Sequence, residues 1–523
     1  MSSSSSSIPP SEIIKNRYLG FLIWQSLATA PIHLLLSPSP RLLSFLLLHL
    51  SLLLLSLSLF LLSSPHPHPS APPPLLLSSL LKSLIAGGGS SPSSADARHR
   101  SRRTLASAAF LLASAMSGSL AVAAVAGRRG GVLEAGAAGA VLGLGFGADY
   151  LYRRRWVFGF PIIQRTLYYS FKMGLSSSAK QALKLSTVSF FSSTVLMIFL
   201  PDQFKSKTTR VQFIIQLIYF YVGMSAVSFC WELSHHLLQV MHTKRCSFAP
   251  PQGSAAAETN PSEPLLEALE QSSPRSLLQY LAYLDLCMVS ESNVEPWRRA
   301  AFFEETGETY RRIISVCLRP LEQLTSRLAE GLEGISKDKS DMLSQQLISP
   351  TDSYGDSRLH EAFNDLQVCT WSARTVAALT ARSRWEDRYG VAQLTSCNST
   401  VVSTLLCTLM AVEVCLGKKT SPQPAQFMGP ANIRWATGST GRRDIQTATP
   451  SKKRGSALYG NAYALADVLR TSIYEIVSAF QADMQGNAKA LLEKNWIVDG
   501  KPLYGTREIL VQKLSLFLDF RAN

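Results

Sequence analysis

The sequence predicts an all-α protein with a six-helix transmembrane region followed by a cytosolic α-helical domain with disordered loops. The mean hydropathy of the 523 residues is +0.11, which is high for a soluble protein and low for one buried entirely in lipid. Charge divides the chain, because residues 1–245 hold 22 of the 51 Lys and Arg residues but only 6 of the 36 Asp and Glu residues. In this basic part, six apolar segments approach the ~20 residues that a helix needs to cross a bilayer.

Six candidate spans follow residues 1–17, which are Ser-rich and are expected to be disordered. Lys15 and Arg17 precede the first apolar run, but no small-residue cleavage site follows it, so we expect a retained helix and no signal peptide. The short SPSPR link predicts that the first two spans form a hairpin. The membrane domain is predicted at residues 18–245, with spans at about 18–36, 42–62, 104–126, 132–151, 183–200 and 211–231.

Six spans place both termini on the same side of the membrane. That side would hold 16 Lys and Arg residues, whereas the opposite side would hold six. Because basic residues accumulate on the cytosolic side of membrane proteins, the termini and the C-terminal domain are predicted to be cytosolic. The sequon at Asn398, followed by Ser399 and Thr400, is then expected to stay unmodified.

Small residues recur at every fourth position in the fourth span. This spacing places them on one helix face and allows another helix to approach closely in lipid. The alternative is simple compositional bias, since the whole segment GGVLEAGAAGAVLGLGFGA is rich in Ala and Gly. The candidate packing residues are Ala135, Gly139, Gly143 and Gly147.

A shorter apolar segment lies between the second and third spans, at about residues 72–89. Its leucines share one helix face and its serines lie on the others, a pattern typical of a helix that lies in the membrane interface. The alternative is a disordered loop rich in Pro, Ser and Leu. The candidate interfacial residues are Leu77, Leu80, Leu81 and Leu84.

Residues 246–273 are polar and rich in Pro, Ser and Glu, so we expect a linker there. Residues 274–523 show helical periodicity and form the predicted soluble domain, in which Pro320 is expected to kink a long helix. Two segments look like loops, at about 334–354 and 417–455. The second is polar and basic, and it is a partner motif, a phosphorylated tether or a solvated loop.

No catalytic or metal-binding pattern is found. The eight cysteines lack CxxC and Cys/His spacing, and HExxH, GxSxG and P-loop motifs are absent from the sequence, so no cofactor, metal or enzymatic activity is expected. The basicity lies between apolar segments and not on a folded soluble domain, so direct nucleic-acid binding is not expected. Asp285 with Arg298 and Arg299 is interpreted as a structural ion pair or a helix-packing contact.

The stretch LLQYLAYLDLCMVSESNVEPWRRAAFF, at 277–303, resembles the most recognisable block of the nuclear-division-cycle (NDC-type) transmembrane nucleoporin family. In this family an LA…DL…S helix leads through a short polar link to an RR…F helix. The start NRYLGFLIWQSLA, at 16–28, is also similar. Tyr310 stands where the family often has Trp. The matching residues are Leu281, Asp285, Leu286, Ser290, Arg298, Arg299, Phe302 and Tyr310.

The resemblance implies a structural protein of the pore membrane, in the nuclear envelope, that anchors the scaffold of the nuclear pore complex and assists pore assembly. Its implied partners are the lipid bilayer and soluble scaffold nucleoporins that dock on the C-terminal domain, and a homo-oligomer is compatible with it. Candidate docking positions are Trp297, Trp385 and Trp435.

Two alternatives were weighed against this function. A transporter or channel with a cytosolic helical regulatory domain would need ionisable residues inside the spans. Such residues are nearly absent there, with Glu134 near one edge and His33 and His49 in the Leu-rich hairpin. A membrane-bound lipid-modifying enzyme would need a polar cluster at the interface. Only Glu232, His235 and His236 come near to forming one.

Overall fold

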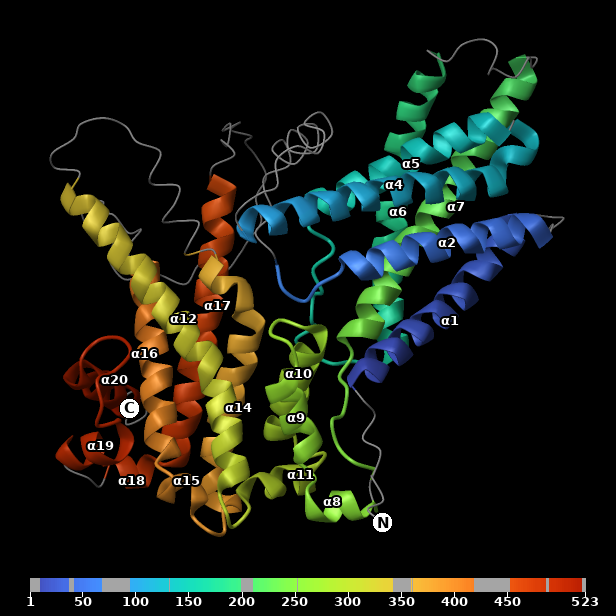
Figure 1. Cartoon of the computed structure of the whole chain (residues 1–523). Coiled ribbons are helices and arrows are strands. Elements are labelled where there is room, and N and C mark those ends of the chain that lie inside the picture. The colour runs from blue at the N-terminus through green and yellow to red at the C-terminus, as the bar shows by residue number, and fades with distance from the viewer. Residues whose placement is uncertain are drawn as a thin grey trace, which may run out of the picture. The chain divides into compact units, whose positions relative to one another are not determined.

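The chain folds into two helical units, each described separately below. The computed structural model describes residues 10–36, 42–67, 95–130, 132–198, 210–251, 253–341, 359, 361–417, 452–485 and 489–519. Within these ranges the regular elements are all helices, which confirms the all-α fold class (Figure 1). Unit 1 comprises Met1–Cys246 and Pro274–Leu281, and unit 2 comprises Ser247–Ser273 and Ala282–Asn523.

Unit 1 is a bundle of long helices. Helix α4 packs along α5, α6 along α7, α2 against α4, and α1 against α7. Five of these helices begin before or end after the predicted spans. The first, for example, begins at Pro10, eight residues ahead of the predicted start. The helices are α1 (Pro10–Leu36), α2 (Leu42–Leu62), α4 (Ala95–Gly130), α5 (Val132–Tyr152), α6 (Leu167–Ile198) and α7 (Arg210–Thr243).

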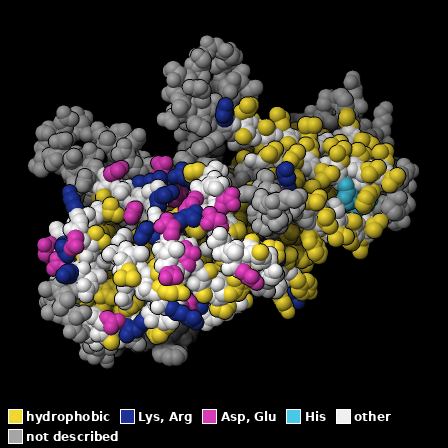
Figure 2. All heavy atoms as spheres, turned by 60° about the horizontal axis from the view of Figure 1, so that its bottom comes forward, with side chains coloured by type: hydrophobic (Ala, Val, Ile, Leu, Met, Phe, Trp, Pro, Cys, Tyr) yellow, Lys and Arg dark blue, Asp and Glu magenta, His cyan; other side chains and the backbone are white. Residues whose placement is uncertain are grey.

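The surface of unit 1 is apolar, and polar side chains lie in its interior. Figure 2 shows hydrophobic side chains covering one part of the molecule with few charges among them, whereas on the other described part charges of both signs lie among polar and hydrophobic groups. Inside unit 1, the Ser56 hydroxyl donates to Oε1 of Gln25 (2.8 Å), and Nε2 of Gln25 donates to the Ser234 hydroxyl (3.0 Å). A surface of this kind suits lipid, because soluble proteins rarely expose such large apolar areas.

Six described helices are long and apolar enough to cross a membrane, but they are not the predicted six. Five overlap the predictions: Glu12–Leu35, Leu42–Leu62, Thr104–Ala126, Val132–Tyr152 and Ile214–Thr243. The predicted span at 183–200 is missing from this set, and Cys397–Gly417 of unit 2 takes its place.

Helix α6 carries the missing span as far as Ile198, and its residues explain its lower hydropathy. Ser186, Ser189 and Ser193 are buried, whereas Val188 and Phe191 are more than half exposed. The serines therefore face the bundle and the apolar side chains face outward, as expected of a helix in lipid.

Unit 2 is built around four helices, α12 (Glu308–Asp341), α14 (Leu366–Glu386), α16 (Cys397–Gly417) and α17 (Lys452–Ala479). Within the apolar window of α16, 67% of the residues are buried, and Val401, Leu405 and Leu409 are fully covered. Its hydrophobicity is thus used in a protein core, so we place α16 in the core of unit 2.

Shorter helices complete unit 2. Residues 246–273, predicted as a linker, contain two of them, because Ser254 caps one and the other buries Leu265, Leu266 and Leu269. Helix α12 runs on to Asp341, past the predicted loop start at 334 and through Pro320. The shorter elements are α8 (Ala255–Thr259), α9 (Glu263–Gln271), α10 (Leu277–Glu291, shared with unit 1), α11 (Pro296–Ala300), η2 (Ala301–Phe303), η4 (Phe363–Asp365), α15 (Val391–Leu394), α18 (Gln481–Gln485), α19 (Lys489–Trp496) and α20 (Arg507–Asp519).

Candidate functional site

A buried ion pair lies at the centre of the block that carries the family resemblance. Nη2 of Arg298 in α11 donates to Oδ2 of Asp285 in α10 at 2.7 Å, and the two side chains are 2% and 0% exposed. The same carboxylate accepts the backbone N–H of Phe248 at 2.9 Å. A buried charge is costly unless it is paired and hydrogen-bonded, and here both conditions are met.

The Arg298 guanidinium has further partners that tie three segments of unit 2 together. It donates to the Phe248 carbonyl (3.2 Å), the Ser247 hydroxyl (3.2 Å) and the Glu295 carboxylate (2.8 Å). Burial lowers the pKa of Arg298, but the charge of Asp285 and the hydrogen bonds to Asp285 and Glu295 outweigh it and raise the pKa overall. The pair therefore holds Ser247 and Phe248, the first residues after Cys246, against α10 and α11.

Arg299 belongs to a second network, which joins α11 to α14. It forms two hydrogen bonds with the Glu386 carboxylate, Nε–Oε2 at 2.7 Å and Nη2–Oε1 at 2.6 Å. Its Nη2 also donates to Oδ1 of Asn293, which accepts a further bond from Arg382. The structure thus separates the two arginines that the sequence analysis grouped with Asp285.

The remaining block residues are buried. The Ser290 hydroxyl donates to the Leu286 carbonyl at 2.8 Å, and the Tyr310 ring stacks on Phe303 with centroids 5.3 Å apart. No chemical role is visible for these side chains beyond packing. At most 1% of any of them is exposed: Leu281, Leu286, Ser290, Phe302 and Tyr310.

Tyr283 was missed by the sequence analysis, although Pro320 offered a signal for it. Proline has no N–H, so the carbonyl four residues earlier in a helix, that of Val316, loses its usual donor. The Tyr283 hydroxyl donates to this carbonyl at 3.1 Å. Burial raises the pKa of Tyr283, so it remains a neutral donor.

Apolar side chains are exposed in one short segment of unit 2, residues 385–394, which we call the 385–394 corner. Trp385 is 70% exposed, Tyr389 54% and Leu394 81%. The Asp387 carboxylate accepts the N–H groups of Tyr389 and Ala392, which fixes the turn between α14 and α15. Of the other predicted docking residues, Trp297 is partly buried and Trp435 lies outside the described residues.

The small residues of the fourth span lie where α5 meets α4. A Cβ on Gly139 would overlap the Gly118 carbonyl, and one on Gly143 would overlap the Ser114 carbonyl. Gly147 faces the Ser114 side chain, and Ala135 is fully buried. The two backbones approach more closely here than larger residues would allow.

Two acidic side chains of unit 1 have hydrogen-bond partners inside the unit. Glu232 is buried and forms two hydrogen bonds with Arg155, one of them Nη1–Oε1 at 2.9 Å. Glu232 was expected at the membrane interface, but α7 continues twelve residues beyond the predicted end of its span and turns this side chain inward. Glu134 accepts a hydrogen bond from Gln216 at 2.7 Å.

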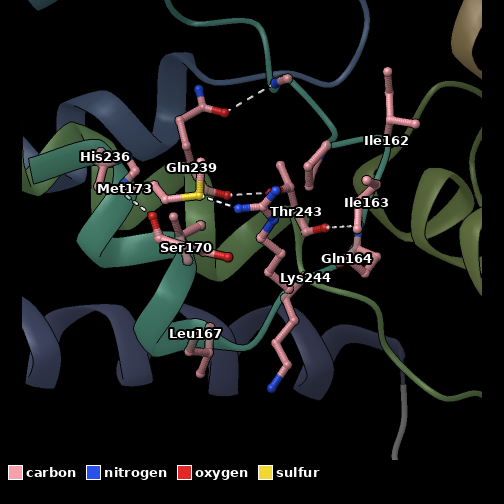
Figure 3. A pocket seen from close by; sticks show the side chains of 15 residues that line it. Ile162, Ile163, Gln164, Leu167, Ser170, Met173, His236, Gln239, Thr243 and Lys244 are labelled. Carbon is pink, nitrogen blue, oxygen red and sulfur yellow. Dashed lines mark hydrogen bonds between the residues drawn. The ribbon is translucent and has the colours of Figure 1, made fainter. Parts of the chain in front are cut away.

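A cavity of about 620 Å³ opens in unit 1 between the 159–165 loop, the start of α6 and the end of α7 (Figure 3). Side-chain amides frame it, because Gln239 accepts the Gly159 N–H (3.1 Å) and Gln164 accepts the Arg245 N–H (3.2 Å). His236 shares a hydrogen bond with the Ser170 carbonyl, so it is occupied in holding α7 to α6.

A metal site is not found within the described ranges, because no three His, Cys, Asp or Glu side chains lie close enough together there to bind a metal ion. Burial raises the pKa of the Cys287 thiol and that of Cys369 to about 12, so neither forms a thiolate at neutral pH. The candidate interfacial residues Leu77, Leu80, Leu81 and Leu84 lie outside the described residues.

Comparison with known proteins gives one family. The family model described as nucleoporin protein Ndc1-Nup matches residues 75–353, slightly more than half of the chain. No curated protein matches the chain.

Replacing Asp285 by Ala is expected to destabilise unit 2 by about 3–5 kcal/mol, because Arg298 would remain buried without its partner. Thermal unfolding of the full chain in detergent measures the change. Glu308→Ala, which breaks an exposed pair with Arg311, is the control and should cost less than about 1 kcal/mol. An equal loss of stability in the two variants would show that the buried ion pair stabilises unit 2 no more than the exposed pair does.

Gly143→Ala is expected to destabilise unit 1 by about 1–3 kcal/mol, since the added methyl group meets backbone atoms that cannot move aside alone. Gly136→Ala is the matched control, because its Cβ would meet only the Ser119 hydroxyl, at 3.2 Å. The same unfolding assay compares them, and unchanged stability of Gly143→Ala would contradict the close helix contact.

Proposed function

The chain belongs to the nucleoporin Ndc1-Nup family, and from this premise we propose that it anchors the scaffold of the nuclear pore complex in the nuclear envelope and assists pore assembly. The observation that carries the proposal is the family match itself, which begins in unit 1 and extends into unit 2. The apolar surface of unit 1 supports an anchor, and the ion-paired helical bundle of unit 2 supports a docking domain.

The proposed orientation places both termini and unit 2 on the cytosolic and nucleoplasmic side of the pore membrane. It is supported by the distribution of basic residues, since the loops that would share the side of unit 2 contain most of them. Soluble scaffold nucleoporins can reach unit 2 only from that side.

The proposed docking surface is the 385–394 corner. Within the described part of unit 2, Leu394 and Trp385 are among the three most exposed large apolar side chains. Trp and Tyr are enriched among the residues that dominate binding energy at protein interfaces. The Asp387 hydrogen bonds and the Arg299–Glu386 pair hold this surface in one conformation, which lowers the entropic cost of binding.

Affinity purification of the tagged full chain is expected to recover pore scaffold nucleoporins, and Trp385→Ala should reduce the recovery about tenfold or more. Tyr463→Ala is the control, because Tyr463 is 56% exposed on α17, away from this segment in the sequence. Imaging of fluorescent fusions checks that the variants still reach a punctate nuclear rim.

Two results would count against these proposals separately. If the unaltered chain shows a reticular or cell-surface pattern and recovers no scaffold protein, the anchoring function is wrong. If it recovers scaffold proteins and Trp385→Ala recovers them equally well, only the docking surface is wrong.

A further inference from the structure

The cavity of Figure 3 contains two cationic side chains with no acidic partner. Arg165 and Lys244 both line it, both are exposed, and neither forms an ion pair with any residue that the structure describes. The Ser170 hydroxyl lines the same space, whereas the Thr243 hydroxyl already donates to the Gln239 carbonyl at 2.7 Å. This arrangement favours an anion, because two cations without an acidic partner line a space whose wall contains no carboxylate side chain.

An apolar groove of about 620 Å³ lies next to this cavity, between α1, α6 and α7. Leu167 and Val240 line both spaces, so the cavity and the groove are adjacent. No charged residue lines the groove. Its wall on α7 runs from Phe229 to Met241, a length of about 18 Å at a helical rise of ~1.5 Å per residue. This length is comparable with the ~15 Å depth of one leaflet of the bilayer hydrocarbon core.

The residues around the cavity mouth are typical of a membrane surface. Ile162 and Ile163, which line the cavity, are 88% and 66% exposed, and Tyr168, which lines the groove, is 67% exposed. Aromatic residues gather at the headgroup level of membranes, and basic residues mark the cytosolic leaflet, where anionic lipids are enriched. The cavity therefore has the composition of a headgroup region, and the groove has that of an acyl-chain region.

We propose that the cavity and the groove together bind one anionic glycerophospholipid from the surrounding leaflet. Arg165 and Lys244 contact the phosphate and the acidic headgroup, with the Ser170 hydroxyl as a neutral donor. One acyl chain lies in the groove against Leu233 and Leu237. A free inorganic anion would leave the groove empty, and a neutral lipid would leave part of the positive charge uncompensated.

Titration of the purified full chain in detergent with phosphatidylserine, followed by native mass spectrometry, tests the headgroup contacts. The double variant Arg165→Gln/Lys244→Gln is expected to bind phosphatidylserine about tenfold more weakly, since each lost cation weakens attraction to an anionic lipid. The matched control is Lys172→Gln/Lys180→Gln, which removes the same charge from exposed positions of α6 outside the cavity, and it should bind as the unaltered chain does.

A second pair of variants tests the groove. Ala28→Trp fills the groove from α1 and is expected to weaken phosphatidylserine binding, whereas Ser26→Trp adds the same bulk at an exposed position of α1 outside the groove and should have no effect. Glycerophosphoserine and inorganic phosphate, which carry the anion without acyl chains, should not compete for the site.

Three outcomes would overturn the proposal. If phosphatidylcholine binds as tightly as phosphatidylserine, the positive charges of Arg165 and Lys244 do not select an anionic headgroup. Equal loss of binding in both double variants would show a diffuse electrostatic effect. Full competition by glycerophosphoserine or phosphate would identify the ligand as a soluble anion. The unfolding temperature of each variant, measured without added lipid, excludes simple misfolding as the cause.

Discussion

The constraint on which the rest of the structure depends is the contrast between the surface and the interior of unit 1. Leu35, Leu43, Leu61 and Phe191 are each more than 60% exposed, while Gln25, Ser56 and Ser234 hydrogen-bond inside the bundle. In water the exposed leucines would drive aggregation, whereas in a bilayer they need no protein partner. Lipid is therefore part of the fold of unit 1, and unit 2 is consequently a domain attached to a membrane.

Much of the fold could be predicted because membrane helices and soluble helices leave different patterns. Long apolar runs mark α2 and α4, whose apolar segments coincide with the predicted 42–62 and 104–126. The hydropathy of a helix does not identify its surroundings in two cases. Helix α6 is rich in serine because it turns Ser186, Ser189 and Ser193 inward, and α16 is as apolar as a span because unit 2 encloses it.

The sequence identified the residues of the candidate site, but it did not identify the side chains and backbone groups that hydrogen-bond with them. The block residues were identified from the resemblance, yet Glu386 and Phe248, which bind Arg299 and Arg298, are far from them in the sequence. The Tyr283 hydroxyl donates a hydrogen bond to the Val316 carbonyl, which Pro320 leaves without its helical donor. The sequence alone does not show that these two residues, on α10 and α12, lie next to each other. Burial also gives a second reason for the sequon at Asn398 to stay unmodified, because this side chain is 5% exposed in α16 and would resist glycosylation on either side of a membrane.

The central claim is that the helices of unit 1 hold unit 2 at the membrane on its cytosolic side. Protease added to sealed microsomes that contain the full chain with an epitope at Asn523 tests it most directly. The account predicts that the epitope is digested while the microsomes remain intact and a lumenal marker stays protected. An epitope that is lost only after detergent opens the membrane would place unit 2 in the lumen and contradict the account.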